Sequence, residues 1–574
     1  MKLLWNALLN YKKESILAPL LKMTEALLDL FVPLVMARII DTGIGNADSA
    51  YVIRGCLILI ALGAGGLAIS ITAQFFAARA AVGISSDLRH GLFEKITSFG
   101  YGELDHFGSG TLLTRMTSDI NQIQNAVNLA LRLLLRSPFI VFGAAVMAFT
   151  VSARAALIFV AAIPLLALVV FGIMKITRPM YKGVQTRLDV LTGIAHENIG
   201  GMRVVRAFGR GADETERFRS ANAALLNDQM VTGRISSLMN PLTMVIVNLA
   251  IIAILNTGAV MVNAGSLTQG AVIALVNYMS QILIELVKLA NLIVQISRGL
   301  ASADRIEQLM ALNPAMEYPE KGAQPVGNGN GEPACVFENV SFAYPGSQED
   351  ALEEISFSVN EGETIGIIGG TGSGKTSIVN LICRNYDTQG GCVRVFGNDV
   401  KRYEKGVLRA QIGLVPQKAR LFLGTIRSNL LFGRENASDA ELWEALDAAC
   451  ASEFVQKKEG GLDAEVEEGG LNFSGGQRQR LTIARALVRK PRILILDDSS
   501  SALDYATDAL LRKNIRAMNG TMTIILISQR TNTIMNADRI LVLDDGKMAG
   551  YASHAELLET CDIYRDIYES QYGK

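Results

Sequence analysis

Residues 369–376 read Gly-Gly-Thr-Gly-Ser-Gly-Lys-Thr, and this stretch decides the fold of the second half of the chain. It matches the pattern GxxxxGK[ST], and an apolar run at residues 364–368 precedes it. Between a strand and a helix, such a loop brings backbone N–H groups around phosphate oxygens. Lys375 would neutralise phosphate charge, and Thr376 would bind Mg²⁺. The stretch therefore predicts a nucleotide-binding site in an α/β domain.

The composition predicts that a membrane part and a soluble part coexist in this chain. The 574 residues are 50% hydrophobic with a mean hydropathy of +0.28, yet 19% of them are charged. We assign residues 1–312 to an α-helical transmembrane domain, 313–333 to a linker rich in Gly, Pro and Asn, and 334–574 to a P-loop domain. Apolar runs separated by helical segments predict a largely parallel sheet in that last domain.

Six apolar stretches in the first 300 residues are each near the ~20 residues that cross a bilayer. The connections between them are alternately short and long, and the long ones have a helical periodicity, which predicts helical extensions beyond the membrane. Nine Lys and Arg residues lie from Arg178 to Arg234, and such an excess marks the cytoplasmic side. Both termini are then cytoplasmic. The six predicted spans are 15–40, 55–80, 128–152, 154–176, 236–262 and 268–296.

Charge and side-chain chemistry disfavour other kinds of site. The net charge of −1 gives no support for nucleic-acid binding through a basic surface. The six cysteines have no CxxC spacing and the four histidines do not cluster, so we expect neither a metal centre nor a disulfide framework.

Further motifs suggest a family. Residues 471–480 read Leu-Asn-Phe-Ser-Gly-Gly-Gln-Arg-Gln-Arg, and an apolar run at 493–496 ends in Asp497. With the P-loop, these residues resemble the LSGGQ signature and Walker B strand of ATP-binding cassette (ABC) proteins, with Phe473 replacing the first Leu. The membrane half resembles the six-span half of an ABC exporter, because residues 107–119 and 197–208 match the regions around its two coupling helices. The resemblance covers the whole chain.

The resemblance implies a set of ligands for ATP and Mg²⁺. Tyr344 would stack on adenine, and Thr376, Gln417 and Asp497 would hold Mg²⁺. The signature residues would reach the γ-phosphate of ATP held by a partner cassette, and residues 501–504 match the D-loop. The positions implied in nucleotide binding are Tyr344, Gly369, Gly370, Thr371, Gly372, Ser373, Gly374, Lys375, Thr376, Ser377, Ser474, Gly475, Gly476, Gln477, Asp497 and Asp504.

Two positions depart from the family pattern. Asp498 stands where the family has the glutamate that polarises the attacking water, and Gln529 stands where it has a switch histidine. Asp is shorter than Glu by one methylene, and a displacement of ~1 Å can cost on the order of 10²-fold in rate. Gln529 can donate a hydrogen bond but cannot become positively charged. With Gln417 as the third catalytic candidate, we expect a site that binds ATP and hydrolyses it slowly.

These departures favour one subunit of a heterodimeric exporter. A second ABC half-transporter would supply Glu and His for a competent site, which this chain's signature would complete. The alternatives are a slow homodimer, a mainly regulatory nucleotide-binding subunit of a lipid or peptide transporter, and an exporter-type fold that imports a chelate such as a siderophore. The family resemblance also implies a bacterial cell (inner) membrane.

Polar residues inside the predicted spans could indicate the kind of compound that is transported. They could line a cavity for hydrophobic or amphipathic, drug-like or lipid-like compounds, because polar groups are costly in lipid. For Glu25 and Asp29 we favour a different explanation, that they lie near a membrane interface or bond neighbouring helices. The alternative for Glu285 and Lys288 is a pair along one helix. The polar residues are Glu25 and Asp29 in the first span, Asn240 and Asn248 in the fifth, and Asn277, Gln281, Glu285 and Lys288 in the sixth.

Overall fold

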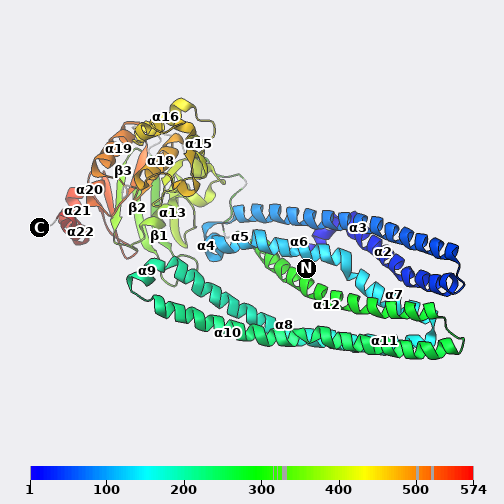
Figure 1. Ribbon diagram of the computed structural model, residues 1–574. Helices are drawn as coiled ribbons and strands as arrows, with labels where there is room; N and C mark the ends of the chain where they lie inside the picture. The colour runs from blue at the N-terminus through cyan, green and yellow to red at the C-terminus, as the bar shows by residue number, and fades with distance from the viewer. Residues whose placement is uncertain are drawn as a thin grey trace. The chain divides into compact units, whose positions relative to one another are not determined.

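The computed structural model describes residues 2–314, 316–319, 321–325, 332–499, 503–518 and 522–572. The chain divides into two compact units, one formed by Met1–Thr97 and Gly110–Leu312, the other by Ser98–Ser109 and Asn313–Lys574. Residues 98–109, which the sequence analysis placed in the first domain, belong to the second unit. Figure 1 follows the chain from the long helices of the first unit to the α/β second unit.

The first unit consists of helices. Its longest helix has 50 residues, or about 75 Å at 1.5 Å per residue, and so extends well past a hydrocarbon core of about 30 Å. The helices are α1 (Lys2–Asn10), α2 (Lys12–Arg38), α3 (Ser49–Ser98), α5 (Ser109–Thr114), α6 (Ile120–Leu129), α7 (Arg136–Val151), α8 (Ala153–Gly200), α9 (Met202–Ala207), α10 (Gly211–Ser237), α11 (Met239–Asn263) and α12 (Gln269–Ala311), with π-helical turns η1 (Ile39–Ile44), η2 (Arg115–Asp119) and η3 (Ala130–Leu134).

Five helical segments of the described chain are long and apolar enough to cross a membrane. They overlap the second to sixth spans expected from the sequence, and each expected span lies within its segment to within one residue at either end. The first expected span falls on α2, where Lys22, Glu25 and Asp29 interrupt the apolar sequence, so the number six stays a prediction. The five segments are Ser49–Ser98, Ser109–Val151, Ala153–Gly200, Gly211–Asn263 and Gln269–Ala311.

Side-chain caps and small residues shape this helical unit. The Ser152 side chain accepts a hydrogen bond from Ala155 N and caps α8, and Thr268 caps α12 in the same way. The core is rich in alanine, which lets the helices approach closely. The Tyr278 hydroxyl of α12 donates to the Leu30 carbonyl of α2 at 2.6 Å.

The second unit is an α/β domain. Its six-stranded sheet has the order β12-β11-β3-β10-β9-β6, with parallel pairing except between β11 and β12, and a four-stranded antiparallel sheet has the order β2-β1-β4-β5. The strands are β1 (Cys335–Phe342), β2 (Leu352–Val359), β3 (Thr364–Gly369), β4 (Gly390–Val395), β5 (Asn398–Asp399), β6 (Ile412–Val415), β7 (Gly424–Thr425), β8 (Glu465–Val466), β9 (Ile493–Asp497), β10 (Thr523–Ile527), β11 (Arg539–Asp544) and β12 (Lys547–Ala552).

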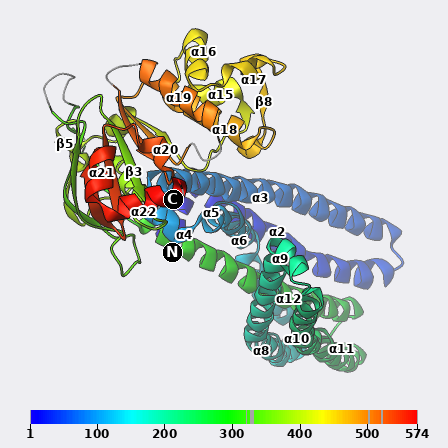
Figure 2. The same ribbon diagram turned by 90° about the vertical axis from the view of Figure 1, so that its left-hand side faces the viewer.

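Among the helices of the second unit, α15 to α19 lie apart from α20 to α22, as Figure 2 shows. The helices of this unit are α4 (Tyr101–Phe107), α13 (Lys375–Ile382), α14 (Val407–Ala410), α15 (Ile426–Leu431), α16 (Asp439–Ala448), α17 (Ser452–Gln456), α18 (Gly475–Val488), α19 (Tyr505–Met518), α20 (Thr531–Ile534), α21 (His554–Thr560) and α22 (Asp562–Tyr572), with 3-10 turns η4 (Val400–Arg402), η5 (Gly461–Asp463) and η6 (Glu468–Gly470).

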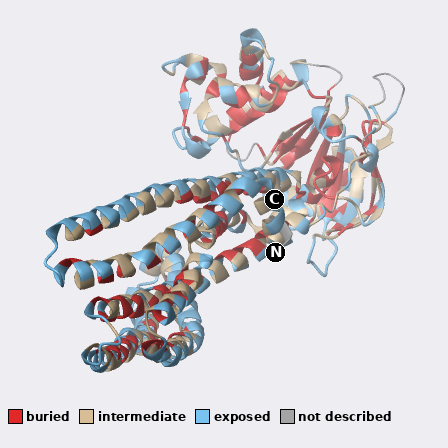
Figure 3. Ribbon diagram, turned by 90° about the vertical axis from the view of Figure 1, so that its right-hand side faces the viewer, coloured by how far each residue is buried: buried red, intermediate tan, exposed pale blue. Residues whose placement is uncertain are grey.

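The central strands of the sheet position the chemistry. Every residue of β3, β9 and β10 is buried (Figure 3). One face of the sheet shares a core with α15, α16 and α18, and the other shares a core with α13 and the antiparallel sheet. The three strands are parallel neighbours, so their carboxyl ends meet at one edge. Functional groups at the ends of these strands therefore gather at that edge.

Candidate functional site

The phosphate-binding loop connects β3 to α13, as the sequence predicts. Gly374 has φ +96°, and a Cβ atom there would lie 2.5 Å from Leu352 Cδ2, so the position requires glycine. Lys375 Nζ donates to the Gly369 carbonyl at 2.9 Å and to Ser373 Oγ at 3.3 Å. The loop turns back on itself at the start of a helix, with its lysine at the centre. These residues fit a nucleotide phosphate group.

Two carboxylates follow β9 next to this loop. Asp497 is 7% exposed and pairs in register with Ile527 of β10. Burial and, to a smaller extent, the neighbouring Asp498 raise the pKa of Asp497 to about 6, against the opposing effect of Lys375. Burial lowers the pKa of Lys375, against the opposing effect of the two aspartates. The loop lysine and the two carboxylates therefore form one electrostatic group.

Asp498 has an unusual backbone conformation. Its φ is +44°, in the left-handed region that Asp tolerates better than most residues, and its N–H donates to the Ile527 carbonyl at 2.9 Å. Gln417, in the turn after β6, donates from Nε2 to Asp498 Oδ2 at 3.4 Å. The structure therefore brings together two of the three residues predicted to be catalytic.

The third of these residues, Gln529, follows β10, and its side chain is exposed. Its carbonyl accepts a hydrogen bond at 2.7 Å from Nε2 of Gln571, a residue of α22. Sequence reasoning missed Gln571, because a residue 42 positions away belongs to no local motif around the switch position.

Tyr344 lies beside the helix that follows the phosphate-binding loop. Its hydroxyl is 3.0 Å from Ser377 Oγ and accepts from Asn380 Nδ2 at 3.3 Å, both on α13. Its ring packs edge-on against Phe342 and Tyr386, with centroids 4.8 and 5.2 Å away. An aromatic face is thus held next to the phosphate-binding segment.

The signature sequence starts α18. Ser474 caps this helix by accepting from Gln477 N at 3.3 Å, and Gln477 Oε1 accepts from Ser474 N at 3.0 Å. Gly475 and Gly476 form the first turn. Phe473 is buried, with Lys458 Nζ 4.1 Å from its ring centroid, so the aromatic side chain is accommodated in the core.

The D-loop is described only in part, because Ser501 and Ala502 lie outside the described residues. Asp504 accepts hydrogen bonds from Thr507 N at 2.9 Å and from Thr507 Oγ1 at 2.8 Å, at the start of α19. These bonds lower the pKa of Asp504 and keep its carboxylate ionised.

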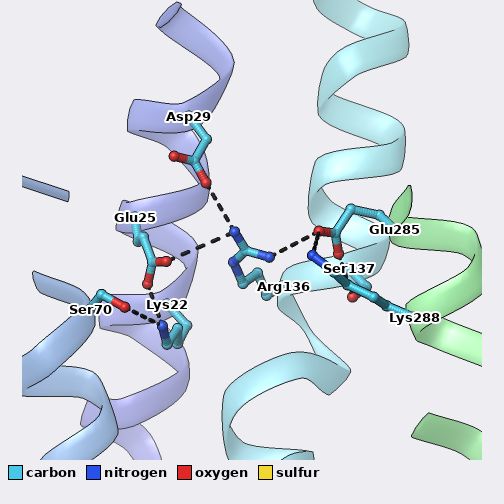
Figure 4. Close-up of polar contacts among 8 residues, drawn as sticks. All are labelled: Lys22, Glu25, Asp29, Ser70, Arg136, Ser137, Glu285 and Lys288. Atoms are coloured by element: carbon cyan, nitrogen blue, oxygen red, sulfur yellow. Dashed lines mark hydrogen bonds and ion pairs between the residues drawn. The ribbon is translucent and has the colours of Figure 1, made fainter. Parts of the chain in front are cut away.

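In the first unit, a polar network joins helices that are distant in sequence (Figure 4). Arg136 donates from Nη1 to Glu285 Oε1 at 3.0 Å and from Nη2 to Asp29 Oδ2 at 2.9 Å, and Nη2 lies 3.8 Å from Glu25 Oε1. Ser137 Oγ donates to Glu285 Oε2 at 2.7 Å. Arg136 thus links α2 to α12 through the first turn of α7.

Two lysines complete this network. Lys22 Nζ contacts Glu25 Oε2 at 2.5 Å and Ser70 Oγ of α3 at 2.7 Å, and Lys288 Nζ donates to Glu285 Oε1 at 2.9 Å. The three cations, Lys22, Arg136 and Lys288, balance the three carboxylates, Glu25, Asp29 and Glu285.

The network shows Glu25 and Asp29 bonded to a neighbouring helix, which is one of the two alternatives that we favoured for them. It also shows Glu285 and Lys288 as the pair along one helix that the sequence offered. Sequence reasoning missed Arg136, although a basic residue inside a predicted span opposite buried acids could have indicated it. Asn240 and Asn248 of α11 are exposed and lie outside the network, and Gln281 has a buried Oε1 without a hydrogen-bond partner among the described residues.

Helix α4 is part of the second unit. The Tyr386 hydroxyl donates to Asp105 Oδ2 at 2.5 Å, and the Tyr386 and Tyr101 ring centroids are 6.1 Å apart. Burial and, after it, this hydrogen bond raise the pKa of Tyr386 well above its usual value. A segment from the membrane half of the sequence is thereby packed on the P-loop domain.

Comparisons with known proteins agree with this architecture. The family model for the ABC transporter transmembrane region matches residues 15–286, and the family model described as ABC transporter matches residues 352–501. An uncharacterized ABC transporter ATP-binding protein of Mycobacterium tuberculosis is 35% identical over 566 residues, which are 98% of this chain and 96% of that protein. The ATP-dependent lipid A-core flippase of Vibrio vulnificus is 30% identical over 574 residues, 100% of this chain and 98% of the flippase.

A solved structure is also similar along its whole length. The structure of a bacterial Atm1-family ABC exporter with ATP bound has a TM-score of 0.81 against this chain at 25% sequence identity. The similarity covers 99% of both chains.

Proposed function

This chain belongs to the ABC transporter family, as an exporter half with a membrane domain and an ATP-binding cassette, and on that premise we propose that it works as one subunit of a heterodimeric pump. Its own Walker site binds ATP and hydrolyses it slowly, and its signature completes the active site of the partner. The observation that carries the proposal is Asp498, a shortened carboxylate at the position of the catalytic base, with Gln529 on the neighbouring strand end.

Each group at the strand ends has a role in this proposal. Backbone N–H groups of residues 369–374 and the Lys375 ammonium bind the phosphates. Oxygen atoms of Thr376, Gln417 and Asp497 hold Mg²⁺, a cation that prefers oxygen ligands and neutralises phosphate charge when bound. Tyr344 stacks on the adenine ring.

Slow hydrolysis follows from two side chains. The side chain of Asp498 is one methylene shorter than that of Glu, so its carboxylate lies farther from the attacking water that it orients. This displacement costs on the order of 10²-fold in rate, or ~2.7 kcal/mol. Gln529 donates a neutral hydrogen bond to the γ-phosphate, where a protonated histidine would add charge stabilisation. Both changes affect the same composite site, so ATP stays bound there while the partner's site turns over.

The signature of this chain serves the other site. Ser474, Gly475, Gly476 and Gln477, at the amino end of α18, reach the γ-phosphate of ATP held by the partner cassette, where a helix N-terminus favours an anion. Asp504 positions the D-loop between the two sites.

The transported compound is hydrophobic or amphipathic, of the drug-like or lipid-like class. The similarity to a lipid A-core flippase supports a lipid-like compound. The pump lies in the cell (inner) membrane, with both termini and the cassette in the cytoplasm, as the basic residues of the second long connection indicate.

The test measures ATPase activity of the purified chain alone and after co-expression with a second half-transporter that carries the Walker B glutamate and the switch histidine. We expect near-zero activity alone, recovery with the partner, and loss of activity when the partner's Walker B glutamate is changed. In the chain alone, the double variant Asp498→Glu with Gln529→His should raise hydrolysis on the order of 10²-fold.

Asp498→Asn is the matched control for this gain. It keeps a residue that tolerates φ +44° but removes the carboxylate, so hydrolysis should not rise. Robust activity of the unmodified chain alone would instead establish Asp498 as a competent base and would favour the homodimer.

A further inference from the structure

A single side chain of the last described helix holds the switch segment. Gln571 Nε2 donates to the Gln529 carbonyl at 2.7 Å. Its Oε1 accepts from Thr531 N at 2.8 Å and from Thr531 Oγ1 at 3.0 Å. The two ends of one amide therefore bind the backbone on both sides of Arg530, and three hydrogen bonds fix this turn.

The rest of the switch segment is held from other elements. Ser528 Oγ accepts from Arg530 N at 3.0 Å, and Arg512 of α19 donates to the Thr533 carbonyl at 2.9 Å. Thr531 is fully buried, whereas the Gln529 side chain is exposed. The backbone is thus fixed while the Gln529 amide is free to point at a ligand. Gln571 is the group that binds the carbonyl of Gln529 itself.

Helix α22 is well placed for this task. Tyr564 is fully buried in the cassette core, and its hydroxyl lies 2.7 Å from His554 Nδ1 of α21. Gln571 follows Tyr564 by seven residues, so both lie on one face of the helix. Figure 2 shows α22 beside α20, the helix that begins at Thr531. The anchored helix presents its last turn to the switch segment.

We propose that Gln571 is a positioning residue for the switch glutamine. By fixing the carbonyl of Gln529, it directs that residue's amide to the γ-phosphate, and so it gives this site its preference for ATP over ADP. The inference rests on the proposed contact between Gln529 and the γ-phosphate. It adds a role for α22, which none of the sequence motifs includes.

The test compares the affinities of MgATP and MgADP for the full-length chain purified in detergent, by calorimetric titration. Gln571→Met keeps the length of the side chain but loses all three hydrogen bonds. It should lower the ratio of Kd(ADP) to Kd(ATP) about tenfold, because one hydrogen bond to the charged γ-phosphate is then misplaced. The affinity for ADP should stay within about twofold of that of the unmodified chain. Ser570→Ala, the neighbouring exposed position, should leave the ratio unchanged.

Two further variants make the result decisive. Gln571→Glu keeps the acceptor for Thr531 but loses the donor to Gln529, so it should lower the ratio as Gln571→Met does. Combining Gln571→Met with Gln529→Ala should lower the ratio no further than Gln529→Ala alone, because both changes remove one contact.

The outcomes that overturn the inference are distinct from those that overturn the proposed function. An unchanged ratio in Gln571→Met, or an equal loss of ATP and ADP affinity, would reduce Gln571 to a structural role. Failure of Gln529→Ala to lower the ratio would instead refute the switch contact itself. If Gln571→Met lowers the thermal unfolding temperature too far for titration, an unchanged ratio in Gln571→Glu overturns the inference.

Discussion

At the scale of single residues, the environment of Asp497 has a consequence for metal binding. The residue ends a buried strand, and burial together with Asp498 raises the pKa of its carboxyl to about 6. Above pH 6 the carboxylate is ionised and can bind Mg²⁺, whereas below pH 6 a proton occupies it. An exposed aspartate would become protonated only near pH 4. Burial thus brings metal binding by Asp497 into a range of pH that titration can reach.

We expect the affinity for Mg²⁺ in the presence of ATP to fall about tenfold between pH 7 and pH 5, as the proton competes for Asp497. Titrations of Mg²⁺ at several pH values measure this. ATP itself also binds protons in this range of pH, so Asp497→Asn is the control. This variant should bind Mg²⁺ weakly, and the only pH dependence left in its Mg²⁺ affinity should be that of ATP. Identical pH profiles of the unmodified chain and Asp497→Asn would contradict the prediction.

At the scale of elements, the network around Arg136 joins α2, α7 and α12 through charges that are mostly buried. The exposed fraction of the side chain is 13% for Arg136 and 5% for Glu285. A buried ion pair adds little to stability over an apolar pair, but removing one partner leaves an uncompensated charge. The network therefore determines which helices pack together more than it increases stability.

Arg136→Met should lower the free energy of unfolding by roughly 3–5 kcal/mol, because three carboxylates then face two lysines. Adding Glu285→Gln restores the charge balance and should recover part of the loss. Thermal unfolding in detergent measures both, with the exposed Arg298→Met of α12 as control. Equal stability of the single variant and the unmodified chain would show that the network is not needed for packing.

A second prediction at this scale concerns α4, which Tyr386 holds on the cassette. Tyr386→Phe keeps the ring contacts with Tyr101 but removes the hydrogen bond to Asp105, a contact of about 1 kcal/mol for a partly exposed partner. Amide hydrogen exchange in Tyr101–Phe107 should become about fivefold faster. Tyr101→Phe is the control, and unchanged exchange in Tyr386→Phe would show that other contacts fix α4.

At the scale of the whole molecule, local patterns predicted the membrane half, the α/β half and the positions of the nucleotide motifs. The phosphate-binding loop was predictable because adjacent residues specify it. Contacts between distant residues were not, since Arg136 and Glu285 are 149 positions apart and Gln529 and Gln571 are 42 apart. No local pattern pairs such residues. The charges of Lys22, Glu25 and Asp29 within the apolar stretch of α2 also explain why its assignment as a membrane span stays a prediction.

The charge balance of the membrane unit also bears on how the chain is made. Asp29 leaves the ribosome 107 residues before Arg136, and Glu285 follows 149 residues later still. Until then, the middle of α2 carries the charges of Lys22, Glu25 and Asp29 without Arg136, and these charges make it unfavourable for the helix to lie alone in lipid. If α2 is a span, it would stay beside the insertion machinery until Arg136 of α7 is synthesised and neutralises its acidic residues. The first long helix to be synthesised would thus be among the last to settle in the bilayer.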